Sequence, residues 1–260
     1  MFSIDASGLR ALTARFGSLS SRELSRATQT AVRNSAYAAR AALSDEIVHV
    51  FDSPTPLTQK SVLVKSLYDR GGPTPAYSYV VYVRDDIGHG TPPDVYLHPE
   101  IFGGARVIKP FERRLQRQGL LPQGMYAVPG ARAPLDRYGN ITGGKIEQIL
   151  SAVGAAEQFA GFQGNRTAKS AKRLGRKRID YFVGSPGAVN RTALANGAKV
   201  LGIWQRVGSN SLRPILIFVR PPSYSRRLDF FGVANRAISL AWPAQFRDAL
   251  RRELDATAKS

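Results

Sequence analysis

The chain has 260 residues, 43% of them hydrophobic, and its 37 lysines and arginines against 19 acidic residues give a formal net charge of +18. The length can bury an ordinary core, and the charge favours polyanionic partners, nucleic acid first. No cysteine is present, which excludes disulfide bonds, cysteine-ligated zinc and a thiol nucleophile. The apolar runs fall far short of the roughly 20 residues that cross a bilayer, and no secretion signal is visible, so we expect a soluble protein without a membrane partner.

The first predicted element is a long helix from Ser21 to about His49. Ser20 lies three residues ahead of Glu23, which is a helix-start signal. An apolar stripe follows at three- and four-residue steps: Leu24, Ala27, Ala31, Ala38, Ala42, Leu43 and Ile47. Because the stripe is mostly alanine, another backbone can approach closely, and we expect this helix to pack against a sheet or a second helix.

After this helix the pattern changes to alternation, which predicts a hairpin over 61–84 with a glycine- and proline-rich turn at 69–75. The next segment, 86–141, has the composition of a long loop, with one short helix from Pro110 to Gln118. Long connections in compact domains are commonly binding loops or arms. We therefore predict a projecting arm over 86–141.

Thr142 is predicted to cap a helix from Gly143 to Val153. Residues 154–178 follow, the most polar part of the chain, rich in basic residues and glycine. Such a segment repels itself, so we expect it to be exposed and flexible.

The remaining sequence predicts strands at 180–183, 200–206 and 214–219, the last two forming a second hairpin. A final helix is expected from Asp229 towards Ala256, kinked or split at Pro243. Its candidate buried residues are Ala234, Ile238, Phe246, Leu250 and Leu254.

Together these elements predict an α+β fold in a single domain, 1–260. A mixed or antiparallel sheet would form from the hairpin regions at about 61–84 and 179–220, packed by the long N-terminal and C-terminal helices. The segments 86–141 and 154–178 would extend from it.

Candidate catalytic residues are few. His49, His89 and His98 lie too far apart in sequence to form a metal-binding face on a helix, and we interpret each as structural. The adjacent acids Asp85–Asp86 and Asp45–Glu46 are interpreted as solvated surface.

Other catalytic motifs are missing. The sequence Gly184–Gly187 resembles a nucleophile elbow only superficially, because Pro186 removes the backbone N–H that an oxyanion hole would use. No glycine cluster matches a nucleotide-binding motif. We therefore predict no catalytic residue, no metal, no cofactor and no enzyme activity.

The strongest electrostatic feature is a run of basic residues without an acid among them. It favours sequence-independent contact with a phosphate backbone, because no aromatic residue within it could read bases. The alternative is a solubilising linker that binds nothing in particular. The candidate DNA contacts are Arg166, Lys169, Lys172, Arg173, Arg176, Lys177 and Arg178.

The middle of the chain resembles a known family over about 95–155. The segments that carry the resemblance are His98–Arg106, Lys109–Leu115, Gly119–Pro122 and Leu135–Thr142. They resemble tailed-phage and prophage morphogenesis proteins grouped with minor tail protein Z and the tail-completion proteins. The pattern contains no catalytic residue.

This resemblance implies a structural virion protein of the phage neck, made in the host cytoplasm. Six copies would form a homo-oligomeric ring that joins the tail tube to the head connector around the DNA channel. Its partners would be other copies, other phage neck and tail proteins and, non-specifically, the packaged DNA.

Two other functions stay open on sequence grounds. The first is a non-specific nucleic-acid-binding protein that acts outside a virion, which the basic run favours. The second is a hydrolase with a site in the 86–141 segment, for which His89 and His98 would be required.

Overall fold

The protein has the α+β fold that the sequence predicts, with two long helices and antiparallel sheets. Its contacts divide it into two compact units where the sequence predicts one domain. Unit 1 comprises Met1–Asp94 and Arg227–Ser260, and unit 2 comprises Val95–Arg226. The computed structural model describes residues 21–67, 78–88, 90–155, 179–184, 202–207 and 211–257.

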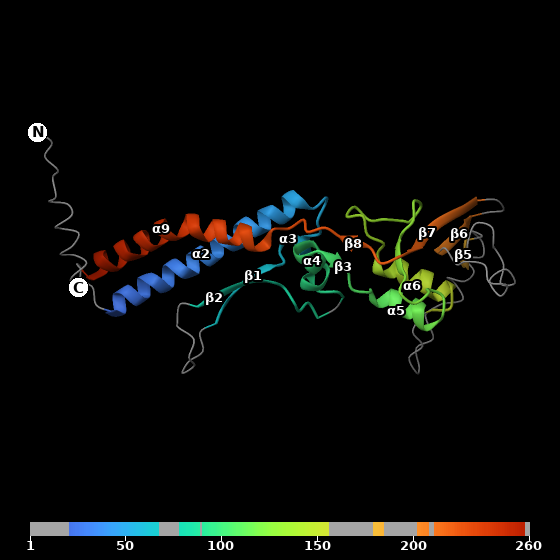
Figure 1. Ribbon diagram of the computed structural model, residues 1–260, viewed down its shortest axis with the longest axis horizontal. Helices are drawn as coiled ribbons and strands as arrows, with labels where there is room; N and C mark the ends of the chain where they lie inside the picture. The colour runs from blue at the N-terminus through green and yellow to red at the C-terminus, as the bar shows by residue number, and fades with distance from the viewer. Residues whose placement is uncertain are drawn as a thin grey trace, which may run out of the picture. The chain divides into compact units, whose positions relative to one another are not determined.

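Two long helices form the framework of unit 1. Helix α2 (Ser21–Val50) is the predicted N-terminal helix, and helix α9 (Phe230–Thr257) is the predicted C-terminal one. They lie side by side and antiparallel, the start of α2 beside the end of α9 (Figure 1). Thr257 Oγ1 donates a hydrogen bond to Glu23 Oε1 at 2.7 Å where these two ends meet.

Small side chains line the contact between α2 and α9, as the alanine stripe predicts. Ala27 and Ala31 are fully buried there, and so little side-chain volume lets the two backbones approach closely. Leu24 belongs to the predicted stripe but is 46% exposed, because the end of α9 lies beside Glu23. The buried residues of α2 recur mostly at four-residue steps: Ala27, Ala31, Ser35, Ala36, Ala39, Leu43 and Ile47.

Helix α9 continues through Pro243 as one element, so the predicted split does not occur. Of the candidate buried positions, Ile238 is 36% exposed. The other candidates lie nearer the ends of the helix or are half-buried: Ala234, Leu250 and Leu254 are buried and Phe246 is partly so.

The predicted first hairpin is present in unit 1. Strands β1 (Val62–Ser66) and β2 (Tyr79–Val83) pair antiparallel and pack against α2, which the short helix α3 (Pro56–Gln59) follows. Arg40 Nε on α2 donates to the carbonyl of Val62 at 3.1 Å. These strands form a two-stranded sheet of their own, so the two hairpin regions do not share one sheet.

Unit 2 is built on a four-stranded antiparallel sheet in the order β4-β7-β6-β5. The strands are β4 (Tyr126–Pro129), β5 (Ile179–Gly184), β6 (Gly202–Val207) and β7 (Ser211–Val219). Strands β6 and β7 form the second predicted hairpin, with an irregularity at Ile203 and Trp204. A separate small sheet pairs β3 (Gly104–Ala105) with β8 (Ser223–Tyr224).

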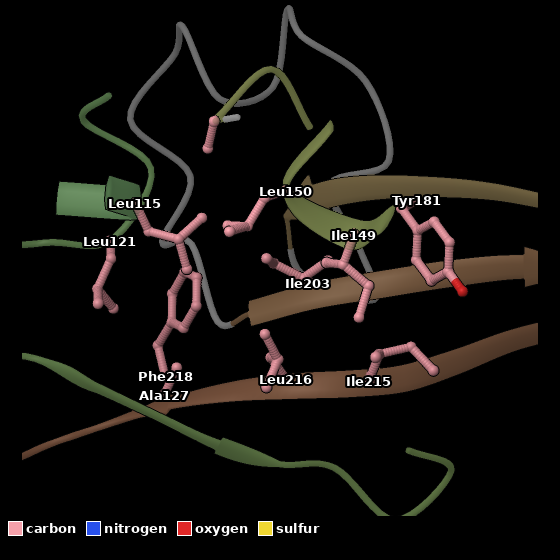
Figure 2. Close-up of a cluster of buried hydrophobic side chains, with 11 residues drawn as sticks. Leu115, Leu121, Ala127, Ile149, Leu150, Tyr181, Ile203, Ile215, Leu216 and Phe218 are labelled. Atoms are coloured by element: carbon pink, nitrogen blue, oxygen red, sulfur yellow. The ribbon is translucent and has the colours of Figure 1, made fainter. Parts of the chain in front are cut away.

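Helices α5 (Pro110–Arg117) and α6 (Gly143–Ala152) supply apolar side chains to a core on one face of this sheet. Figure 2 shows Ile149 and Leu150 of α6 above Ile203 of the sheet. As predicted, α6 begins after Thr142, whose backbone is extended. The Thr142 side chain, however, makes no capping hydrogen bond.

The 86–141 segment is more structured than the predicted loop. Besides α5, it contains helix α4 (Pro93–Phe102) and strands β3 and β4. Leu115, Leu121 and Ala127 from this segment belong to the core of unit 2. The sequence hides α4, because Pro99 lies inside the helix and glycines follow it.

Candidate functional site

The structure leaves the predicted DNA contacts undescribed. All seven basic residues of the run lie outside the described residues: Arg166, Lys169, Lys172, Arg173, Arg176, Lys177 and Arg178. Of the predicted flexible segment 154–178, only the first two residues are described.

The two histidines that the structure describes, His49 and His98, lie on different helices. His49 is exposed in the last turn of α2, and the rings of His98 and Phe102 are tilted against each other with their centroids 4.7 Å apart. His89 lies outside the described residues. Asp85 and Asp86 are exposed, as predicted. Among the described residues, no three His, Asp or Glu side chains are grouped so that they could hold a metal ion.

The most completely bonded polar group in the described chain is a buried ion pair in unit 2. Glu112, in the first turn of α5, is fully buried. Its two oxygens accept from both terminal nitrogens of Arg106, at 2.8 and 2.5 Å. They also accept the backbone N–H groups of Lys109 (2.6 Å) and Ala127 (2.7 Å). Charge-assisted bonds of this kind are stronger than neutral ones, so the pair is firmly fixed.

The local sequence explains why Glu112 is placed there. Pro110 occupies the first helical position, where its missing N–H costs nothing, and it keeps Lys109 extended. Glu112 is then the third helical residue, from which a glutamate can reach back to the N–H of the residue before the helix. From this position the same carboxylate also accepts hydrogen bonds from Arg106 and from the backbone of Ala127 on β4.

These contacts set the protonation state of Glu112. Burial on its own raises the pKa of this carboxyl group, but the hydrogen bond from Arg106 and those from the backbone of Lys109 and Ala127 outweigh it. The pKa of Glu112 therefore lies below its ordinary value. The guanidinium of Arg106 also lies 4.7 Å from the centre of the Tyr126 ring, a cation–π distance.

The ion pair also closes one edge of the four-stranded sheet. Ala127 gives its N–H to Glu112, and its carbonyl accepts from Arg106 at 3.4 Å, so its backbone groups point away from β7. Alternate residues of a strand point the same way, so the next outward position on β4 is Pro129, which has no N–H. The edge of β4 therefore offers little to another strand.

The face of this sheet opposite the α5–α6 core is apolar. Phe182 pairs with Trp204, and Ile217 pairs with Val128, all four half-buried and none within the core cluster. The guanidinium of Arg206 lies 5.5 Å from the centre of the Phe182 ring. This outer face, defined by these five side chains, is a candidate binding surface.

A second apolar surface lies on the middle of α9 in unit 1. Leu240 is 82% exposed, the most exposed of the large apolar side chains in the described chain, and Ile238 is also exposed. Leu240 is flanked by residues that are not buried either. Helix α2, by contrast, buries at least one side chain in each turn from Ala27 to Ile47.

Sequence reasoning missed the ion pair and both apolar surfaces. The only sequence signal for the ion pair is Pro110 with a glutamate two residues later, which predicts a helix start but not a buried carboxylate. The sequence signal for the outer face of the sheet lies in β7, where both the odd-numbered and the even-numbered positions carry apolar residues. This pattern is typical of a strand that is covered on both faces.

The comparisons with known proteins leave the family open. No family model, curated protein or solved structure matches the chain. None of the helices among the described residues has the length and apolar character needed to cross a bilayer.

Proposed function

We propose that this chain is a structural virion protein of the phage head–tail junction. Six copies assemble into a ring that joins the tail tube to the head connector around the DNA channel, without catalysis. The resemblance of 95–155 to minor tail protein Z and tail-completion proteins supports this function, and the net charge of +18 suits a protein beside DNA.

The observation that carries the proposal is the exposed middle of α9. Over 235–248 this helix packs along α2 through partly buried residues such as Trp242 and Phe246, while Ile238 and Leu240 are exposed. Leaving Leu240 82% exposed to water forgoes hydrophobic stabilisation of about 1.5–3 kcal/mol that burial of a leucine provides. A neighbouring copy that covers this surface recovers it.

Two different apolar surfaces on one chain favour a ring over a symmetric pair. Each copy carries the α9 surface in unit 1 and the outer face of the four-stranded sheet in unit 2. When one surface of each copy binds the other surface of the next copy, every copy is related to the next by the same rotation. If this rotation is a whole fraction of a full turn, the copies form a closed ring.

The resembling segment supports a structural function as well. Two of its charged residues, Arg106 and Glu112, bond to each other and to the backbone of β4. They tie the start of α5 to strand β4 at the edge of the sheet.

Assembly is tested with a matched pair of variants on α9. Leu240→Asp and Ser239→Asp introduce the same charge at adjacent exposed positions, so neither is expected to unfold the chain. Electron microscopy of each chain mixed with tail tubes should show rings for the wild type and Ser239→Asp but few for Leu240→Asp. A wild-type chain that stays a monomer, alone and with tail tubes, would refute the ring.

The second candidate is a nucleic-acid-binding protein that acts outside a virion, which the basic run favours. Neutralising five basic residues of the run should then abolish nucleic-acid binding and function together: Lys172, Arg173, Arg176, Lys177 and Arg178. In the ring model, particles still form with these replacements.

A further inference from the structure

The hairpin of unit 1 has one edge with unpaired backbone groups. Its inner hydrogen bonds are identified at both ends: Arg84 N–H donates to Ser61 O at 2.7 Å, and Leu67 N–H donates to Ser78 O at 2.9 Å. Positions 78 and 84 of the second strand therefore face β1. Because backbone groups alternate in direction along an antiparallel strand, positions 80 and 82 also face β1.

The residues between them face outward. The N–H and C=O groups of Tyr79, Val81 and Val83 point away from β1, and none of them forms a hydrogen bond within the described part of the chain. Strand β2 carries no charge and no proline. Exposed edges of this kind are templates for pairing with another chain.

Two other edges in the described chain are protected. The edge of β4 is closed by the Arg106–Glu112 pair and by Pro129. On the outer edge of β1, Arg40 donates to the carbonyl of Val62, and the strand carries Lys65, a charge of the kind that discourages pairing. The unprotected edge of β2 is thus a specific feature and not a property of every strand.

We propose that β2 pairs antiparallel with β2 of a second copy about a twofold axis at Val81. In this register Val81 faces Val81 of the partner subunit, and Tyr79 faces Val83 of the partner subunit. The three outward-facing positions then become hydrogen-bonded pairs, each with two hydrogen bonds. The two hairpins join into one four-stranded sheet, with both α2 helices on the same face of it.

The chemistry of β2 favours a second copy over other partners. Tyr79–Val83 reads tyrosine, valine, valine, tyrosine, valine, so the twofold register places apolar residues opposite each other throughout. Two chains that each carry a net charge of +18 repel each other. Contact through an uncharged strand brings no like charges next to each other. The same lack of cations leaves β2 with nothing to attract nucleic acid or an acidic peptide.

This pairing goes beyond the proposed ring. A twofold contact uses the same surface on both copies, whereas a ring around one rotation axis is built from unlike surfaces. We therefore assign the β2 pair to the free protein before assembly, where it covers an edge that would otherwise promote aggregation.

Single cysteines test the pairing directly, because the natural chain has none. In the proposed dimer the two copies of residue 81 have Cα atoms about 5.5 Å apart, within the range that a disulfide spans. Mild oxidation of free Val81→Cys protein should give a covalent dimer on a denaturing gel. The control is Val64→Cys, at the position that faces Val81 across the hairpin on the opposite edge, and it should give at least tenfold less dimer.

Mixing tests the register. Tyr79→Cys and Val83→Cys proteins should each remain monomeric on the gel when oxidised alone and should cross-link when mixed. Equal cross-linking of Val81→Cys and Val64→Cys, or no gain on mixing, would overturn the proposal whether or not rings form on tails.

A proline provides an independent measurement. Val81→Pro removes an outward-facing N–H and preserves the bonds to β1, which an edge strand tolerates. Val64→Pro is the equivalent change on the other edge. With folding checked by circular dichroism, the first should convert the free dimer to a monomer in light scattering and the second should not; a dimer that persists in Val81→Pro contradicts the pairing.

Discussion

Glu112 at the start of α5 accepts the backbone N–H of Ala127 on β4 at 2.7 Å, so a helix terminus and a sheet edge share one carboxylate. Arg106 completes the arrangement by binding both Glu112 and the Ala127 carbonyl. A charge that is fully hydrogen-bonded can be buried without the large cost of an isolated ion. The result is a sheet that ends at β4 and does not recruit a further strand.

Removing the charge of Glu112 should destabilise unit 2. Glu112→Gln leaves the guanidinium of Arg106, only 11% exposed, without its counter-ion, and breaking such a buried pair costs about 3–5 kcal/mol. Glu147→Gln is the control, because its ion pair with Arg114 is exposed and contributes less than about 1 kcal/mol. Urea unfolding measures the free energy of unfolding of both variants. Equal losses of this free energy would show that the buried pair contributes no more to stability than the exposed one.

The same carboxylate predicts how stability depends on pH. The pKa of Glu112 is lower in the folded chain than in the unfolded one, so its contribution is complete above the unfolded value of about 4.3 and is lost as the pH falls through the folded value. The difference in unfolding free energy between wild type and Glu112→Gln should stay constant between about pH 5 and 7 and shrink below about pH 4. A difference that does not change down to about pH 3 would contradict this assignment.

Gly202 should not tolerate a side chain. A Cβ atom there would lie 2.1 Å from the carbonyl oxygen of Leu216 on the neighbouring strand, and a paired backbone cannot move aside. Gly202→Ala should lower the free energy of unfolding by about 1–3 kcal/mol. Gly144→Ala in α6, where nothing lies within 4 Å, should be neutral or stabilising by up to about 1 kcal/mol in the same thermal unfolding experiment.

The alanine contact between α2 and α9 should be sensitive to size. Ala31 is fully buried there, so Ala31→Leu forces the helices apart and should cost about 1–3 kcal/mol in denaturant unfolding. Ala41→Leu places the same side chain at an exposed position of α2 and should change stability by less than about 0.5 kcal/mol. If both variants unfold alike, the contact is looser than the structure indicates.

The elements with strong periodicity could be predicted from the sequence. Helix α2 was predicted to within one residue of its last position, Val50, because its apolar stripe is long. Helix α4 could not be, because it contains Pro99 and is short. Which strands share a sheet depends on contacts between distant residues, so two hairpins were predicted correctly but their division into separate sheets was not.

The candidate surfaces were less accessible to sequence reasoning. Local patterns place charged residues such as Arg106 and Glu112 in solvent, and their burial depends on Ala127, 15 residues beyond Glu112. The exposure of Leu240 likewise cannot be read from local sequence, because it depends on which distant parts of the chain pack over α9. An edge such as β2 is recognised only when the direction of each backbone group is known.

The pairing of α2 with α9 constrains the order in which the protein can fold on the ribosome. Residues 95–226 form a continuous unit that can become compact as soon as it emerges. Helix α2 can pack on β1 and β2 soon after it is made, but its alanine face must wait for Phe230–Thr257. The alanine face of the first long helix to be translated is therefore among the last parts to acquire its native contacts, and nascent chains should need protection for this face until translation is nearly complete.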